Sequence, residues 1–211
     1  MFDIGFDTDV LVSVPKVRQL PPWKRGIDVV SCCCLMLPFA VLCVVLWLLN
    51  PFFNIGPLFY RTSRMGAGML PFEMVKFRTM TGAGSDPRGA YESLDERRIT
   101  PLGRWLRRAR VDELPQLINI WRGEMTLIGP RPDCYHHALA YAREVPGYAR
   151  RFELVPGITG LAQITVGYAQ TVEQVRRKAA ADVLYLRKSN FRLDLWIIMR
   201  TAGVMLRLRG S

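Results

Sequence analysis

One uncharged, strongly apolar run constrains the folding of this chain more than any other feature. Residues 29–49 carry no charged side chain, and as a helix rising about 1.5 Å per residue they would just cross the roughly 30 Å hydrocarbon core of a bilayer. Pro38 lies near the middle of the run, where a proline removes a backbone hydrogen bond and bends a helix. The run therefore predicts a membrane-inserted helix that is broken at Pro38.

Cations on both sides of this run bear on its topology. They are Lys16, Arg18, Lys24 and Arg25 before it, and Arg61, Arg64, Lys76 and Arg78 after it. Because positively charged flanks favour the cytoplasmic side of a membrane, a re-entrant segment that bends at Pro38 and returns would satisfy both flanks. The carbonyls freed at the bend would need local hydrogen-bond partners. An ordinary transmembrane helix with a tolerated kink is the alternative.

The residues just before the run are typical of a membrane interface. Trp23, Lys24 and Arg25 combine an aromatic ring with two cations, which suits the level of the lipid headgroups. Asp28 follows Lys24 by four residues, so the two side chains can form an ion pair on one helical face. Residues 1–22 show no clear periodicity and predict a loosely held N-terminal arm.

Composition restricts the class of partner. The formal net charge is +11 although 50% of the residues are hydrophobic, which implies an anionic partner: nucleic acid, anionic lipid or a phosphorylated substrate. Four of the five cysteines lie within the apolar run. The sequence therefore favours small buried thiols in a reducing compartment over a zinc site or a disulfide framework.

After the apolar run, short strand patterns alternate with helical ones, so the expected fold class is α+β, mostly helical with a small β-hairpin. Residues 58–61 and 72–80 predict two strands, with Lys76 and Arg78 on one face; a merely solvated face is the alternative. Residues 154–163 predict a turn leading into a short apolar strand. Helices are expected at residues 100–110, 133–148, 171–188 and 193–208, and residues 81–98 predict a polar surface loop.

Two of these expected helices are amphipathic and cationic. Residues 100–110 place apolar side chains on one side and arginines, including Arg107, on the other, and residues 193–208 repeat the pattern. Helices of this kind commonly lie on anionic membranes. A surface helix packed on the protein's own core is the alternative for residues 100–110.

Residues 110–132 carry the most informative polar side chains. A helical apolar face is formed at spacings i, i+3, i+4 and i+7 by Leu114, Leu117, Ile118 and Trp121. Pro115 suits the first turn of this helix, so Asp112 and Glu113 would lie at its N-terminus, where free amides favour anions. Arginines precede and follow the two acids. This arrangement suits chemistry on a phosphorylated substrate; the alternative is that the acids only cap the helix.

Six motifs follow one another along the chain. They are Lys24-Arg25-x-x-Asp28 before the proline-broken segment, Lys76-Phe77-Arg78-Thr79-Met80, Asp112-Glu113-Leu114-Pro115-Gln116, Gly129-Pro130-Arg131-Pro132, Pro156-Gly157-Ile158-Thr159-Gly160, and the helix carrying Asp182. In this order and spacing they resemble the bacterial sugar transferase family, the monotopic polyprenyl-phosphate phosphoglycosyl transferases. The resemblance runs from about residue 23 to residue 209, and the short chain resembles the family's minimal catalytic unit.

The resemblance implies that a sugar-1-phosphate passes from a UDP-sugar to polyprenyl (undecaprenyl) phosphate with release of UMP, as the first membrane step of exopolysaccharide or glycoconjugate assembly. It also implies Mg²⁺ and a covalent aspartyl-phosphosugar intermediate. The family's nucleophile falls on Asp112 and its metal-associated partner acid on Glu113, with Asp112 also near the metal. Contacts to substrate phosphate or nucleotide fall on Lys76, Arg78, Arg107, Arg131, Gln163 and Asp182.

The resemblance also implies an organisation and a location. Residues 23–50 would form the re-entrant membrane helix, and residues 51–211 a catalytic domain with interfacial helices on the cytoplasmic face of the bacterial inner membrane. The expected partners are the two substrates and anionic phospholipid, with no nucleic acid; a homodimer is left open.

Three positions depart from the family's pattern. Residues 163–167 read Gln-Ile-Thr-Val-Gly where Gln-Val-Asn-Gly-Arg is usual, which leaves the nucleotide or sugar contacts of this loop open. Thr62 stands where glutamine is frequent, and Leu37 precedes Pro38 where serine is common. A non-catalytic, basic, membrane-bound scaffold that binds anionic lipid is the competing function. Adjacent acids inside a basic surround argue against it, because they would weaken the binding of anions.

Overall fold

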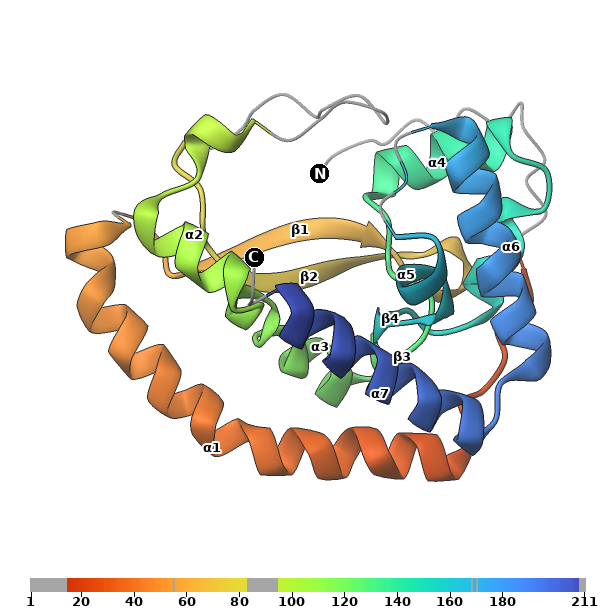
Figure 1. Cartoon of the computed structure of the whole chain (residues 1–211), viewed down its shortest axis with the longest axis horizontal. Helices are drawn as coiled ribbons and strands as arrows, with labels where there is room; N and C mark the ends of the chain where they lie inside the picture. The colour runs from red at the N-terminus through yellow and green to blue at the C-terminus, as the bar shows by residue number, and fades with distance from the viewer. Residues whose placement is uncertain (1–14, 55, 83–94, 168, 170, 209–211) are drawn as a thin grey trace, which may run out of the picture.

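A computed structural model describes residues 15–54, 56–82, 95–167, 169 and 171–208 (Figure 1). The helices are α1 (Pro22–Phe53), α2 (Pro101–Arg108), α3 (Gln116–Arg122), α4 (Tyr135–Glu144), α5 (Leu161–Thr165), α6 (Val172–Lys188) and α7 (Phe191–Leu208). The strands are β1 (Phe59–Met65), β2 (Pro71–Phe77), β3 (Thr126–Ile128) and β4 (Gly157–Thr159). Short 3₁₀ turns are η1 (Ala67–Met69), η2 (Glu96–Arg98), η3 (Val111–Glu113) and η4 (Tyr148–Glu153). The expected α+β class is confirmed.

The apolar run forms the long helix α1. Pro22 occupies its first turn, where a missing N–H has no intrahelical partner to lose, and Pro38 and Pro51 lie inside it. Figure 1 shows that α1 bends near its middle and that its second half turns up beside the body of the protein. The interruption predicted at Pro38 is therefore a bend in a continuous helix. By length and composition α1 is the one described helix that could cross a membrane. Only 17% of its most apolar stretch is buried inside the protein.

The start of α1 is anchored by two buried charges. Lys24 donates to the hydroxyl of Tyr185 and pairs with Asp194 at 3.1 Å. Asp28 accepts a hydrogen bond of 2.9 Å from the backbone N–H of Leu127. Lys24 and Asp28 are 6% and 1% exposed, and the mutual ion pair predicted for them is wrong, since each binds another partner. The ammonium of Lys24 binds Asp194, and the carboxylate of Asp28 binds an amide of β3. Both partners lie far away in the sequence.

Arg25 anchors the same turn to α3. Its guanidinium donates to the backbone carbonyl oxygens of Ile120 at 2.6 Å and Trp121 at 2.8 Å. These carbonyls belong to the last turn of α3, whose acceptors have no intrahelical donors and whose dipole favours a cation. Arg25 therefore caps α3 while fixing α1 against it.

The end of α1 is anchored to the β-hairpin. Asn50 donates to the carbonyl of Gly56, and the Asn54 amide donates to the carbonyl of Arg78 at 2.6 Å. In return the Arg78 guanidinium binds the carbonyls of Asn54 and, at 2.8 Å, Pro57. The segments before and after α1 are therefore both bonded to the same folded body.

Strands β1 and β2 form an antiparallel hairpin with Phe59 opposite Phe77 and Met65 opposite Pro71. Helix α3 is fixed across this hairpin by Asn119, which is fully buried. Its side-chain oxygen accepts from the N–H of Val75, and its NH₂ donates to the carbonyl of Glu73 at 2.8 Å. The predicted hairpin is confirmed, with β2 ending at Phe77, so that Arg78 lies just beyond the strand.

Strands β3 and β4 are parallel, and the backbones at and just beyond them approach each other closely at Gly129, Gly157 and Gly160. We call this close approach the glycine crossing. A Cβ built on Gly157 would lie 2.1 Å from the backbone nitrogen of Gly129, and one on Gly160 would lie 2.2 Å from the Gly129 oxygen. Only glycine permits this approach. The crossing fixes where the chain leaves β3 for residues 129–134. The apolar strand predicted after the turn is wrong in part, because residues 161–165 form the helix α5 that packs beside α6.

The remaining predicted helices are present: α2, α4 and α6 are shorter than predicted, and α7 begins two residues earlier. The spacing Thr171-x-x-Gln174 is typical of a capping box, and the two residues form this reciprocal pair of hydrogen bonds at the start of α6. Most of the polar loop predicted at residues 81–98 lies outside the described residues, as does most of the N-terminal arm. Within residues 15–21, Arg18 donates its backbone N–H to the carbonyl of Glu153 at 2.7 Å, so this part of the arm is held.

The glycine crossing generates a stability prediction. Gly157→Ala forces a methyl group into the Gly129 backbone, which cannot rotate away, and we expect the free energy of unfolding to fall by about 1–3 kcal/mol. Gly203→Ala is the matched control, since a Cβ there meets nothing within 4 Å and an interior helical alanine is favoured over glycine by roughly 0.5–1 kcal/mol. Thermal unfolding of the two variants measures the difference. Equal melting temperatures for the two variants would contradict the close approach at the glycine crossing.

Candidate active site

The two adjacent acids lie on the 3₁₀ turn η3 between α2 and α3. Arg110, at φ +58°, reverses the chain after α2, and Val111–Glu113 then form η3 before Pro115 begins the approach to α3. The sequence predicts Asp112 and Glu113 at the N-terminus of the following helix, and they lie just before it, on a separate 3₁₀ turn that follows the left-handed Arg110. Glu113 faces Lys76 of β2 and Arg131 after β3.

Glu113 is held by two cations from different parts of the sequence. The Lys76 ammonium, on β2, lies 2.9 Å from Glu113 Oε1, and the Arg131 guanidinium lies 2.5 Å from the same oxygen. Burial alone raises the pKa of Glu113, but Arg131 and Lys76 together outweigh burial and hold the pKa well below its usual range. Glu113 is therefore a permanently ionised, charge-paired group.

Asp112 differs from its neighbour. It is 8% exposed and, among the described residues, makes no ion pair within 4 Å. Burial raises the pKa of Asp112 above its usual value against the opposing effect of Lys76, and the adjacent Glu113 charge raises it further. Two carboxylates next to each other thus carry different protonation behaviour, which is typical of acids with separate chemical roles.

Arg107 completes the cationic surround from α2. Its Nε donates to Thr79 Oγ1 at 2.8 Å, and its charge lowers the pKa of Asp112. Helix α2 lies directly on the backbone of Thr79: a Cβ built on Gly103 would lie 2.1 Å from the Thr79 carbonyl oxygen. The Lys76–Met80 motif therefore supplies a cation for Glu113, and through Thr79 it also supplies the hydroxyl and the backbone contact that orient Arg107.

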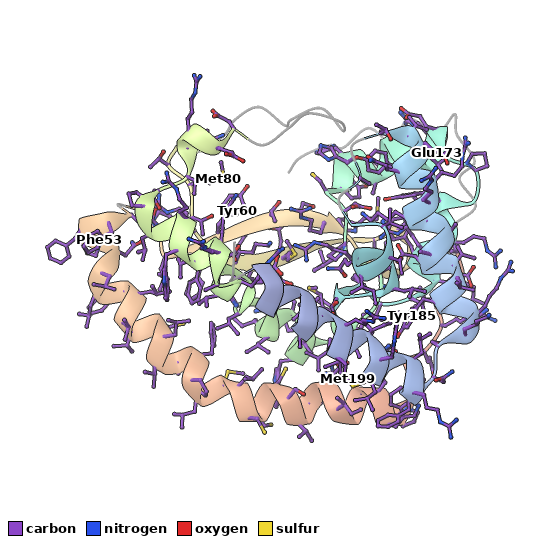
Figure 2. The ribbon with its side chains drawn as sticks, viewed as in Figure 1. Phe53, Tyr60, Met80, Glu173, Tyr185 and Met199 are labelled. Carbon is purple, nitrogen blue, oxygen red and sulfur yellow. The ribbon has the colours of Figure 1, made fainter. Side chains whose placement is uncertain are left out.

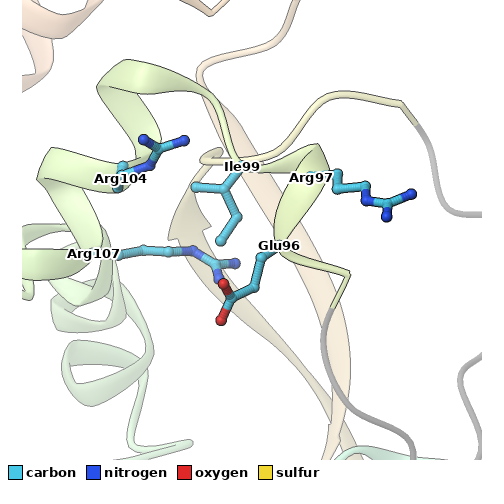
Figure 3. Close-up of a pocket in the computed structure, with 5 residues that line it drawn as sticks. All are labelled: Glu96, Arg97, Ile99, Arg104 and Arg107. Atoms are coloured by element: carbon cyan, nitrogen blue, oxygen red, sulfur yellow. The ribbon is translucent and has the colours of Figure 1, made fainter.

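Arg107 also borders an open pocket of about 430 Å³ between α2 and η2. The pocket is lined by Glu96, Arg97, Ile99, Arg104 and Arg107. Figure 3 shows the side chains of Arg107 and Glu96 pointing towards one another, whereas Arg97 points away. The pocket is wide and largely cationic, so an anionic ligand can approach Arg107 from solvent.

Arg131 and Gln163 meet at one carbonyl. Arg131 Nη1 lies 3.4 Å from the carbonyl oxygen of Ile158, and Gln163 Nε2 donates to the same oxygen at 2.9 Å. The Oε1 atom of Gln163 is buried and has no hydrogen-bond partner. Gln163 is thus next to the cationic site, as the resemblance implies, and its free acceptor can take a donor from a ligand or water.

Asp182 lies in a buried ionic cluster. Its carboxylate accepts from Arg151 Nε at 2.9 Å and lies 2.7 Å from Arg151 Nη2. Lys178 lies one turn before Asp182 on α6, where an ion pair between them is possible, but Lys178 binds Asp133. Arg151 is itself fully buried and is not among the predicted site residues. The signal that could have found it is an arginine five residues before the Pro156-Gly157 turn, flanked by Tyr148 and Phe152.

The structure therefore brings predicted site residues together around the two acids: Lys76 and Arg131 contact Glu113, and the charges of Lys76 and Arg107 act on Asp112. Gln163 joins them through Ile158. Arg78 does not join them, because its guanidinium is bonded to carbonyls at the end of α1.

The acids present fit a magnesium ion that is shared with substrate. Within the described ranges no group of three or more His, Cys, Asp or Glu side chains converges on one point, so no all-protein cage is formed there. Mg²⁺ usually takes one or two carboxylates and completes its shell with water and substrate phosphates. Asp112 and Glu113 are such a pair of carboxylates.

Comparison with known proteins identifies the family of this chain. The family model described as bacterial sugar transferase matches residues 19–208. The UDP-glucose:undecaprenyl-phosphate glucose-1-phosphate transferase of Caulobacter vibrioides is 40% identical, over 97% of this chain and 79% of its own length.

Two longer relatives are also similar. The UDP-N-acetylgalactosamine-undecaprenyl-phosphate N-acetylgalactosaminephosphotransferase of Aeromonas hydrophila is 34% identical over 87% of this chain, which spans 43% of that protein. The UDP-glucose:undecaprenyl-phosphate glucose-1-phosphate transferase of Escherichia coli is 32% identical over 84% of this chain and 39% of its own length. Taken with the family match across nearly all of its residues, these findings show that the chain belongs to the bacterial sugar transferase family.

Proposed function

We propose that this protein transfers a sugar-1-phosphate from a UDP-sugar to a polyprenyl phosphate such as undecaprenyl phosphate and releases UMP, as the first membrane step of exopolysaccharide or glycoconjugate assembly. The observation that carries the proposal is the pair Asp112–Glu113, in which one acid is locked by two cations and its neighbour is buried without an ion pair. The names of the relatives support the same class of reaction.

In the first step, an Asp112 oxygen attacks the phosphorus that bears the sugar. The P–O bond to UMP breaks, the bonding electrons leave on the UMP oxygen, and an acyl phosphate forms on Asp112. The cations around the site oppose the negative charge that develops on the phosphate oxygens. Lys76, Arg107 and Arg131 lie on three different elements, so they can contact the diphosphate from several directions.

In the second step, an oxygen of the polyprenyl phosphate attacks the same phosphorus. The acyl phosphate bond breaks, the carboxylate of Asp112 is regenerated, and the product is a polyprenyl diphosphate sugar. A covalent intermediate divides the reaction so that two bulky substrates use one small site in turn. Burial of Asp112 limits hydrolysis of the acyl phosphate by water.

The two acids divide the work for electrostatic reasons. Both cations contact Oε1 of Glu113 and neutralise its charge, which makes Glu113 a poor nucleophile. Asp112, without such a pair, keeps its oxygens available. We further propose that both carboxylates hold Mg²⁺ together with the diphosphate; when bound, this ion supplies charge neutralisation at the phosphates.

Membrane association follows from the apolar side chains that the fold leaves exposed. On α1 these are Val30, Leu37, Val41, Val44, Val45, Trp47, Leu48, Phe52 and Phe53, and on α7 they are Phe191, Leu195, Trp196, Ile198 and Met199. Figure 2 shows Phe53 projecting away from the body at the end of α1. We propose that α1 enters the cytoplasmic leaflet of the inner membrane and returns, with α7 at the interface with anionic phospholipid.

The nucleophile gives the direct test. Asp112→Asn should abolish turnover, because an amide cannot attack phosphorus and then leave again. Wild-type enzyme mixed with UDP-sugar and Mg²⁺, but no polyprenyl phosphate, should release about one UMP per active site as a burst. Intact-mass analysis should find a hydroxylamine-labile phosphosugar adduct on the peptide that contains Asp112.

Glu173→Gln, at an exposed acid on α6, is the matched control and should retain both burst and adduct. Turnover with polyprenyl phosphate, but neither burst nor adduct without it, would contradict the two-step reaction. It would favour direct attack by the lipid phosphate.

The raised pKa of Asp112 predicts the pH dependence of adduct formation. The nucleophile must be ionised, so the single-turnover rate should fall as the pH falls through this pKa, at a pH above the ordinary aspartate value of about 3.9. Lys76→Met removes the charge that most lowers the pKa of Asp112, so the acid limb should move to higher pH. An acid limb that Lys76→Met leaves in place would refute the assignment of that limb to Asp112.

The anchoring of both ends of α1 predicts its topology. With the five native cysteines replaced by alanine, single cysteines at Val17, before α1, and Leu70, after it, should react with a membrane-impermeant maleimide only after the cells are opened. Both side chains are exposed. Labelling of Val17→Cys in intact spheroplasts, with Leu70→Cys protected, would instead indicate a helix that crosses the membrane.

A further inference from the structure

Residues 129–134, which carry Arg131, leave β3 without regular secondary structure. A long arginine side chain on irregular backbone has many conformations to lose before it can hold Glu113. Three backbone hydrogen bonds tie this segment to β1 and β4: Gly129 N–H to the Thr159 carbonyl at 2.8 Å, Gly157 N–H to the Pro130 carbonyl at 2.9 Å, and Met65 N–H to the Asp133 carbonyl at 3.0 Å. None of them involves the backbone of residue 131 itself.

Arg151 supplies the contact at that residue. Its Nη2 donates to the backbone carbonyl of Arg131 at 2.8 Å. The same guanidinium pairs with the carboxylate of Asp133 and donates to the hydroxyl of Tyr148 at 2.9 Å. Arg151 therefore binds the segment at Arg131 and at Asp133, on both sides of Pro132.

Helix α6 holds Arg151 from the other side. Asp182 accepts two contacts from the guanidinium, at Nε and Nη2, and Lys178 binds the second oxygen of Asp133. The two cations and two carboxylates balance in charge. All four side chains are at most 15% exposed.

We propose that Arg151, held by Asp182, is a positioning residue that fixes the backbone at Arg131 and so keeps the Arg131 guanidinium against Glu113. This rests on the proposed function, in which Arg131 and Glu113 serve the reacting phosphates. Asp182 then acts on the reaction through Arg151 and Arg131, without touching substrate.

The chemistry of the cluster favours positioning over simple stabilisation. Replacing a buried ion network by well-packed apolar residues is often neutral or stabilising, so such a network is weak evidence for stability. What apolar residues cannot do is bind a backbone carbonyl and a carboxylate at fixed angles with one planar group. A guanidinium has five donors in a rigid fork that suits this task.

A double-mutant cycle tests the inference, with the single-turnover rate of UMP release as the readout. Arg151→Lys keeps the positive charge but cannot reach the Arg131 carbonyl, Asp133 and Asp182 together. We expect it to slow the wild-type enzyme by about 10- to 100-fold, and to slow an enzyme already carrying Arg131→Ala by no more than about twofold. Asp182→Asn, taken through the same cycle, is the second variant should Arg151→Lys melt below the assay temperature.

Asp194→Asn is the matched control, because Asp194 belongs to an ion pair of similar burial, with Lys24, that does not touch residues 129–134. Its effect should be the same with and without Arg131→Ala. Equal, multiplicative losses from Arg151→Lys in both backgrounds would overturn the inference and leave Arg151 as a purely structural residue. Failure of the proposed function would appear differently, as the absence of a burst in the unmodified enzyme.

Discussion

The carboxylate of Glu113 lies between the ammonium of Lys76 and the guanidinium of Arg131, and the arrangement of the active site depends on this shared contact. Lys76 belongs to the β1–β2 hairpin, Arg131 to the segment after β3, and Glu113 to the turn between α2 and α3. One side chain thus ties three otherwise separate parts of the fold together. The adjacent Asp112 takes neither cation as an ion-pair partner, and burial, reinforced by the charge of Glu113, raises its pKa against the effect of Lys76.

Each member of this contact is fixed by packing behind it. Gly129, Gly157 and Gly160 let β3 and β4 cross closely enough to place the Arg131 segment, and Gly103 lets α2 rest on the backbone of Thr79. Asn119 bonds α3 to β2 through both ends of its amide. Several residues of the motifs around the site therefore act by setting the positions of the backbone.

Anchoring at both ends also explains how a long apolar helix can belong to a catalytic body. At the start of α1, Lys24 binds α7, Arg25 binds α3 and Asp28 binds β3. At its end, Asn50 and Asn54 bind the hairpin region. The bend between these anchors leaves apolar side chains on the outside. The same geometry places the exposed face of α7 near the start of α1, where Trp23 and Phe191 meet edge to face at 5.8 Å, so that both helices can present one continuous apolar surface.

The sequence by itself determined the α+β class, the apolar helix with its proline, the hairpin and the capping box of α6, because these follow from periodicity and turn residues, which are local properties. Its resemblance to a known family also singled out Asp112, Glu113, Lys76, Arg107 and Arg131 as candidate site residues. Only the tertiary structure decided that Lys24 pairs with Asp194, that Arg78 binds backbone at the end of α1, that Asp182 binds Arg151, and that Glu113 rather than Asp112 takes both cations. Such partners lie tens of residues or more apart in sequence, and a buried charge binds whichever opposite charge or dipole the packing brings within about 3 Å.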